Sequence, residues 1–115
     1  MRQLVGPSFG AAGDTILLVG DGTPGLAGSA YAALAGSTTE DDPPGLDLER
    51  EAAVQRFIRE AIERGLVVSA QDVSGGGFAV ALAECAMWSG LGAQVRLALV
   101  GSPAVALFGE GPSRL

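Results

Sequence analysis

The chain has 115 residues, a formal net charge of −6 and no histidine, and all seven of its basic residues are arginine. Without histidine, neither a Ser-His-Asp triad nor a Cys-His pair can be built, and no histidine metal site can form. The absence of lysine excludes Schiff-base chemistry and a phosphate-loop lysine. The acidic balance argues against nucleic-acid binding, which needs clustered basic residues.

The length fits a single domain over residues 1–115, with an aliphatic core because only 5% of the residues are aromatic. The lone Cys85 cannot form an intramolecular disulfide, which favours a reducing compartment and hence a cytoplasmic protein. We expect Cys85 to be buried rather than catalytic. Residues 74–95 are long enough to cross a bilayer, but five glycines and Glu84 argue against membrane insertion.

The first half of the chain predicts a strand, a short helix and a loop. The apolar run 15–19 lies between turn-forming residues and is typical of a strand. A short helix is expected over residues 28–34, with Ser29 near its start and Gly36 closing it. Residues 37–45 are polar, acidic and rich in proline, which predicts a mobile loop.

The clearest predicted helix lies between Asp47 and Gly65. Asp47 stands at an N-cap position, and Gly65 suits the left-handed residue at the C-terminal end. Apolar residues recur along it at helical spacing. Residues 66–70 are then expected to form a strand, and residues 78–87 a buried, alanine-rich helix.

Residues 93–99 alternate apolar and polar positions, which is typical of a half-buried strand. Pro103 opens a short apolar stretch in the tail, and Trp88 is expected to be a core or interface anchor. The order of these elements predicts an α/β (α+β) fold in which helices pack on a mixed sheet.

The sequence DVSGGG, at residues 72–77, joins a predicted strand to a predicted helix. Glycines allow a ligand to approach the backbone closely, and the free amides at a helix start favour an anion. The pattern is therefore typical of a phosphate site, with Asp72 and Ser74 as organising side chains. A tight turn whose Asp and Ser satisfy local backbone groups is the alternative.

Five ordered segments carry a resemblance to a known family: GDTILLVG (13–20), LAGSAY (26–31), the helix DLEREAAVQRFIREAIERGLVVSA (47–70), DVSGGGFAVALAE (72–84) and LFGEGPSR (107–114). Together they resemble the large, ATP-dependent subunit of phosphoribosylformylglycinamidine synthase, in the aminoimidazole ribonucleotide synthetase superfamily. The resemblance covers nearly the whole chain. It implies a partial, truncated domain of the C-terminal type, from the second half of that enzyme.

This resemblance implies the ATP-dependent conversion of formylglycinamide ribonucleotide and glutamine-derived ammonia to the amidine, in purine biosynthesis. ATP and Mg²⁺ would serve the full enzyme without being held by this chain alone. The implied partners are the rest of the synthase chain, a glutaminase subunit or domain, and the phosphoribosyl substrate. No catalytic residue or metal ligand is expected here. The implied substrate- or phosphate-binding residues are Asp72, Ser74, Gly75, Gly76, Gly77, Ser113 and Arg114.

The chain departs from the family pattern at several polar positions. Gln71 stands where the family has histidine, Gly75 and Ala30 where it has acidic residues, and Gly111 where it has serine. Any acid/base or metal role at positions 30, 71 and 75 is in doubt: Ala30 and Gly75 lack a carboxylate, and Gln71 cannot shuttle protons near neutral pH. A role that uses only backbone amides survives the changes.

Two alternatives remain open at this stage. The chain could be a structural or assembly module that forms a homo-oligomer through an uncovered sheet edge. It could also be a domain of another member of the same superfamily, such as aminoimidazole ribonucleotide synthetase. Arg114 could bind a phosphate or carboxylate, or could be disordered near the chain end.

Overall fold

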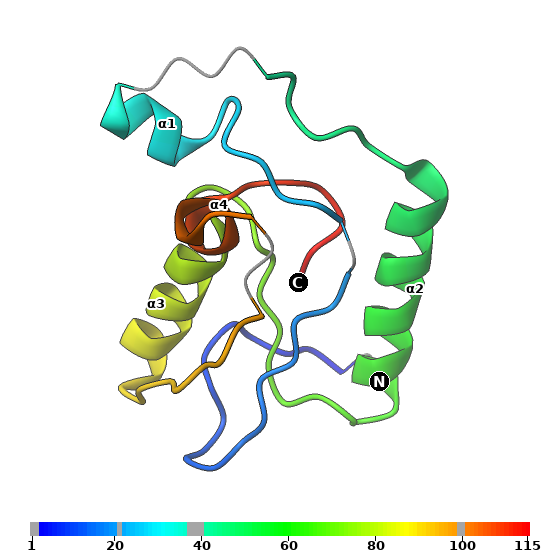
Figure 1. Cartoon of the computed structure of the whole chain (residues 1–115). Coiled ribbons are helices and arrows are strands. Elements are labelled where there is room, and N and C mark those ends of the chain that lie inside the picture. The colour runs from blue at the N-terminus through cyan, green and yellow to red at the C-terminus, as the bar shows by residue number, and fades with distance from the viewer. Residues whose placement is uncertain (1–2, 21, 37–40, 99–100) are drawn as a thin grey trace.

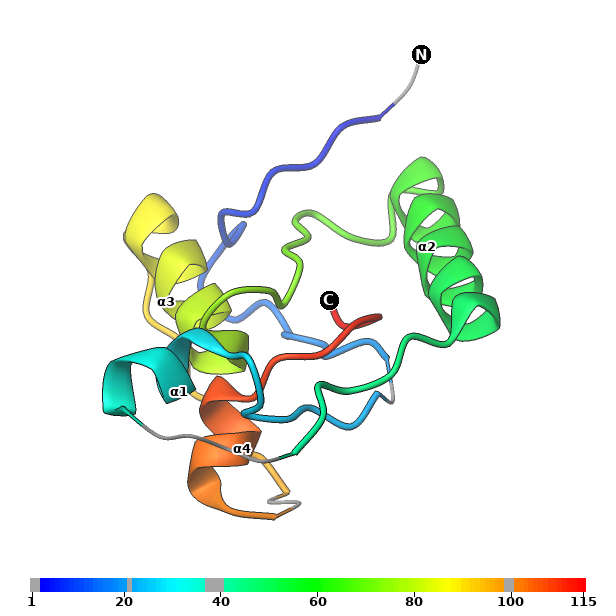
Figure 2. The same ribbon diagram turned by 90° about the horizontal axis from the view of Figure 1, so that it is seen from above.

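The computed structural model describes residues 3–20, 22–36, 41–98 and 101–115. Extended segments lie between α2 on one side and the pair α3 and α4 on the other (Figure 1 and Figure 2). Helices α3 and α4 pack together. The helices of this part of the chain are α1 (Ala30–Ala35), α2 (Leu48–Glu63), α3 (Gly77–Ser89) and α4 (Pro103–Phe108).

The three predicted helices are confirmed, and their caps explain where they begin and end. In α1, Ser29 Oγ accepts the N–H of Ala32, and Gly36 ends the helix in the left-handed conformation. In α2, the Asp47 carboxylate accepts the N–H groups of Glu49 and Arg50 at 3.0 and 3.1 Å.

Helix α4 was not predicted, although its start follows ordinary rules. Ser102 caps it by accepting the N–H of Val105, and Pro103 occupies the first turn, where its missing N–H costs nothing. The stretch was interpreted only as apolar because six residues are too few to show a helical period.

The predicted mixed sheet is not present in the residues that the structure describes. Two extended pairs of segments meet there in isolated bridges, Gly6–Ser69 and Gly25–Glu110. Val19 also exchanges two backbone hydrogen bonds with Leu115, at 2.8 and 3.0 Å. Because pairing stops after one residue pair in each case, the predicted strands 15–19 and 66–70 and the described part of 93–99 remain extended segments.

The hydrophobic core is small and lies where α3 meets the segment before it. Val73, Phe78 and Ala81 are buried together, with Leu82 and Leu97 packed against them. Cys85 is buried in α3, as predicted, and burial raises the pKa of its thiol.

Many large apolar side chains of the described residues stay outside this core. Trp88 is 54% exposed, so it is not a core residue, and Phe57 on the apolar face of α2 is 53% exposed. Ile16, Leu17 and Leu18 are also exposed, because the strand predicted for them has almost no neighbour. The described chain therefore presents apolar surface on α2, on α3 and along the extended segments.

The predicted loop 37–45 is described only in part, since residues 37–40 lie outside the described residues. Residues 41–45 form neither helix nor strand, and Pro44 is half-buried beside Gly25. The mobility of this loop stays a prediction. Among the described helices, none is both long enough and apolar enough to cross a membrane.

Candidate functional site

A pocket of about 600 Å³ lies between α2, the segment before α3 and the C-terminal segment. It brings together four of the seven residues that the sequence pointed to, Asp72, Ser74, Ser113 and Arg114. Its other lining residues are Leu46, Glu51, Val54, Gln55, Ile58, Val73, Gly111, Pro112 and Leu115.

Ser113 is buried and hydrogen-bonded to a carboxylate of α2. Its hydroxyl donates a 2.6 Å hydrogen bond to Glu51 Oε2, and this bond lowers the pKa of the Glu51 carboxyl, with a smaller contribution from Gln55. The single hydroxyl proton is used in this bond, so Ser113 cannot also donate to a ligand phosphate while the bond lasts. In this conformation Ser113 positions Glu51 instead.

Arg114 is buried, with 9% of its surface exposed, and its main-chain oxygen accepts the N–H of Val73 at 3.0 Å. Burial lowers the pKa of its guanidinium group. Among the described residues, its Nη1 has no hydrogen-bond partner. A buried cationic donor without an acceptor is costly, so this side chain favours an anionic partner. The alternative that Arg114 is disordered is wrong.

The Gly-rich turn adopts the conformation that its glycines allow. Gly76 and Gly77 have φ values of +88° and +72°, which side-chain-bearing residues rarely adopt. A Cβ on Gly77 would lie 2.7 Å from the main-chain carbon of Phe108 and 2.8 Å from the Gly109 oxygen. The turn therefore needs glycine both for its backbone and for the close approach of the chain that follows α4.

Two amides of this turn, those of Gly76 and Gly77, are already bonded within the chain. Gly76 donates its N–H to Glu110 Oε1 at 2.8 Å, and Gly77 donates to the Ser74 carbonyl oxygen at 3.0 Å. Gly75 is exposed, whereas Gly76 and Gly77 are buried. The Gly76 end of the turn thus already holds a carboxylate.

Gln71, at the position of the family histidine, bonds to a residue of α3. Its Nε2 donates to Glu84 Oε2 at 3.0 Å in a partly buried environment. Glutamine and glutamate here form a neutral–charged hydrogen bond with no group that titrates as histidine does. The arrangement provides positioning rather than proton transfer.

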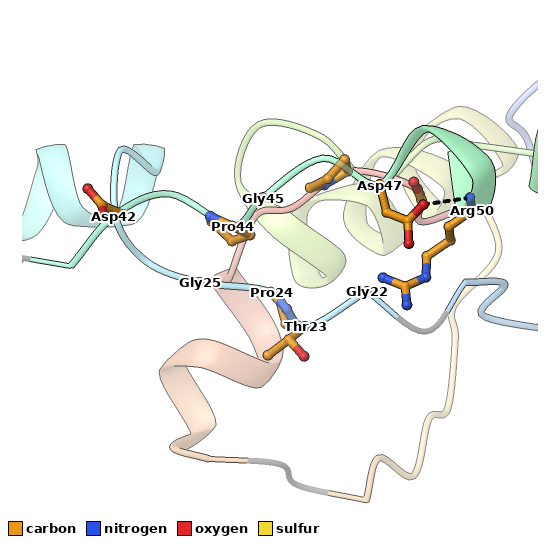
Figure 3. Close-up of a pocket in the computed structure, with 11 residues that line it drawn as sticks. Gly22, Thr23, Pro24, Gly25, Asp42, Pro44, Gly45, Asp47 and Arg50 are labelled. Atoms are coloured by element: carbon orange, nitrogen blue, oxygen red, sulfur yellow. Dashed lines mark hydrogen bonds between the residues drawn. The ribbon is translucent and has the colours of Figure 1, made fainter. Parts of the chain in front are cut away.

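A second pocket, of about 390 Å³, lies between the segment 22–25, the segment 42–47 and the start of α2 (Figure 3). Asp47 caps α2 here, and the Arg50 side chain extends toward the segment that carries Gly22. Ser113 is the only predicted site residue that lines it. This pocket therefore borders the first one without sharing its other predicted residues.

Comparison with known proteins places the chain in a family. Residues 11–114 match the sequence model of the family described as AIR synthase related protein, C-terminal domain. The chain belongs to this family. The family supports an AIR synthase C-terminal-like fold, whereas the mixed sheet predicted with it is not seen in the described residues.

Relatives of this AIR synthase related domain are subunits of one enzyme. The chain is 46% identical, over its full length, to phosphoribosylformylglycinamidine synthase subunit PurL of Moorella thermoacetica and covers 16% of that protein. It is 44% identical over its full length to the PurL subunit of Symbiobacterium thermophilum, of which it covers 15%. It is 40% identical over its full length to the PurL subunit of Synechococcus sp. (strain CC9902), of which it covers 16%. The chain thus spans about one sixth of the length of these curated relatives.

Two functional candidates were missed from the sequence. Glu110 stands inside the LFGEGPSR segment, but its role became visible only in its contact with the Gly-rich turn. Glu51 was one of several charges on a helix surface, and no local signal distinguishes it from the others. Both act on residues far away in the sequence, which local patterns do not reveal.

The described residues contain no cluster of three or more histidine, cysteine or acidic side chains that could hold a metal ion. Asp72 and Glu51 both line the larger pocket.

Proposed function

We propose that this AIR synthase related domain serves a phosphoribosylformylglycinamidine synthase, which forms the amidine from formylglycinamide ribonucleotide, ammonia and ATP. The observation that carries the proposal is the 46% identity to a PurL subunit across all 115 residues. The named relatives favour this enzyme over aminoimidazole ribonucleotide synthetase, the other superfamily member considered. The activity would belong to the whole synthase rather than to this domain.

Within the synthase, we assign the larger pocket to the phosphoribosyl substrate. Arg114 supplies the positive charge that a phosphate group needs, and the Ser74 hydroxyl lies in the same lining. Asp72 provides a carboxylate of the kind that accepts hydrogen bonds from ribose hydroxyls. The Gly76 and Gly77 amides are a weaker choice for the phosphate, because both already have acceptors within the chain.

The remaining parts of the reaction are assigned to other regions of the synthase. ATP and Mg²⁺ would bind mainly to the other regions of the synthase. A glutaminase subunit or domain would supply ammonia. We expect the protein to work in the cytoplasm without a nucleic-acid or membrane partner.

A chimeric enzyme tests the proposal. The aligned residues of the Moorella thermoacetica PurL subunit are replaced by this chain, and ATP-dependent amidine formation from formylglycinamide ribonucleotide and ammonia is measured. We expect an active chimera, and no activity from the 115-residue chain alone. A folded chimera without activity would contradict the assignment, as would amidine formation by the chain alone.

Exposed apolar surface favours a second candidate, an assembly role. Leu17, Val68 and Met87 are 69%, 66% and 79% exposed, on segments that a partner could cover. On this reading the chain forms a homo-oligomer through its extended segments. Analytical ultracentrifugation distinguishes the two: a clean monomer over a wide concentration range would count against the assembly role.

A further inference from the structure

One carboxylate oxygen of Glu110 accepts hydrogen bonds from two backbone amides, each at the start of a different helix. Its Oε1 accepts the N–H of Gly76, at the N-cap of α3, and the N–H of Ala30, the first residue of α1, each at 2.8 Å. The Glu110 main chain also exchanges hydrogen bonds with Gly25 at 2.8 and 2.9 Å. Both the backbone and the side chain of Glu110 are therefore held in place.

These two amides belong to the class of groups that bind anions at helix starts. The first N–H groups of a helix lack intrahelical acceptors, and the helix dipole favours negative charge beside them. Hydrogen bonds to a carboxylate are about twice as strong as neutral ones. An external phosphate would have to displace Glu110 and would meet its negative charge during the approach.

Packing around Glu110 keeps the carboxylate in reach of both helices. The ring of Phe108, the last residue of α4, stacks on Tyr31 of α1 with centroids 5.2 Å apart. The chain then passes so close to Gly77 that a methyl group there would overlap it. Two residues after Phe108, the Glu110 side chain thus starts from a position fixed against α1 and α3.

We propose that Glu110 is the resident anion of the Gly-rich turn, which keeps external phosphate off the Gly76 amide and ties the start of α1 to the start of α3. The turn is then a joint between elements rather than a phosphate site. This role depends on the contacts of Glu110 alone, so it holds whether or not the protein is a synthase.

Amide NMR on the 115-residue chain tests the proposal with two measurements, hydrogen exchange and a titration with inorganic phosphate. In the unmodified chain, we expect the Gly76 and Ala30 amides to be protected and phosphate to shift neither. Glu110→Ala should speed exchange at both amides by roughly ten- to a hundredfold, the range for losing a hydrogen bond to a charged group. Glu110→Gln should give a smaller increase at both, because a neutral amide oxygen still accepts.

Glu84→Gln is the matched control, since it removes the same charge from α3 itself. Its carboxylate bonds to Gln71 rather than to the turn, so exchange at Gly76 and Ala30 should not change. If Glu110→Ala does not fold, the unmodified chain and Glu110→Gln still decide the question. Saturable phosphate shifts at Gly76 in the unmodified chain would overturn the proposal, as would rapid exchange of both amides there or an effect of Glu110→Gln on only one of them.

Discussion

The Ser113 hydroxyl donates a 2.6 Å hydrogen bond to Glu51 Oε2 and so joins the C-terminal segment to the first turn of α2. Both residues line the pocket that contains Arg114. The bond fixes the side of the pocket formed by α2 relative to the segment that carries the cation.

Removing the hydroxyl should raise the pKa of Glu51. In Ser113→Ala, we expect the Glu51 pKa to move up toward the ordinary glutamate value, because the largest cause of its depression is gone. Part of the depression should remain, since Gln55 Nε2 still donates to Glu51 at 2.7 Å. A carboxyl ¹³C NMR titration measures both effects, and Gln55→Ala should cause the smaller shift of the two variants.

The same bond should make stability depend on pH in the acidic range. Because folding lowers the Glu51 pKa, its contribution is present above the pKa of the unfolded chain and is lost as the pH falls through the folded pKa. Denaturant unfolding should therefore show a stability gap between the unmodified chain and Ser113→Ala at neutral pH that narrows in acid. A gap that widens in acid would contradict this account.

Ser113 also has a left-handed backbone conformation, with φ of +61°. Ser113→Gly and Ser113→Ala both lose the hydroxyl, but only glycine adopts this φ without steric cost. We expect the glycine variant to be more stable than the alanine variant by about 1–2 kcal/mol. Chemical denaturation of the pair measures the difference, and equal stabilities would argue against backbone strain at Ser113.

Substitutions at Arg114 should have different effects on stability and on ligand binding. Arg114→Met keeps most of the buried side-chain volume and removes an unpartnered cationic donor, so it should be at least as stable as the unmodified chain. Arg114→Ala leaves a cavity and should be less stable than the methionine variant by about 2–5 kcal/mol. Thermal and denaturant unfolding test this order.

In the chimeric synthase, both Arg114 variants should raise the KM for the ribonucleotide, because the phosphate loses its cationic partner. The methionine variant is the decisive one, since its fold should be intact. An unchanged KM in Arg114→Met would remove Arg114 from the substrate site while leaving the stability argument in place.

Gly77→Ala should be strongly destabilising, by about 2–5 kcal/mol. Its Cβ would overlap the main chain of Phe108 and Gly109, and its φ of +72° is strained for alanine. Gly75→Ala is the matched control in the same turn, because a Cβ there meets nothing within 4 Å. Similar losses in the two variants, measured by denaturant unfolding, would contradict the close approach seen at Gly77.

The local rules of the sequence were sufficient for three of the four helices in the described residues. Capping residues such as Ser29 and Asp47, together with a helical apolar period in α2, predicted where helices begin and end. The extended segments were harder, since strand pairing depends on neighbours far along the chain. Their apolar patterns are those of strands, yet in the described residues the backbones meet at isolated positions only.

The candidate site also combines features that the sequence shows with features that only the tertiary contacts decide. The DVSGGG turn and the LFGEGPSR segment are visible in the sequence, as is the family they belong to, because short motifs keep their residue order. That the turn already holds a carboxylate was decided by a contact between Gly76 and Glu110, 34 positions apart. The hydrogen bond between Ser113 and Glu51 joins two residues that are 62 positions apart in the sequence.

By itself, the sequence determined the excluded chemistries, the helices α1, α2 and α3 and the family resemblance, all of which depend on composition or on residues close together in the chain. Only the tertiary structure decided that Arg114 is buried beside a pocket and that Glu110 occupies the turn amides. The physical reason is that a hydrogen bond or a desolvated charge depends on what packs against it, and here those partners come from distant segments.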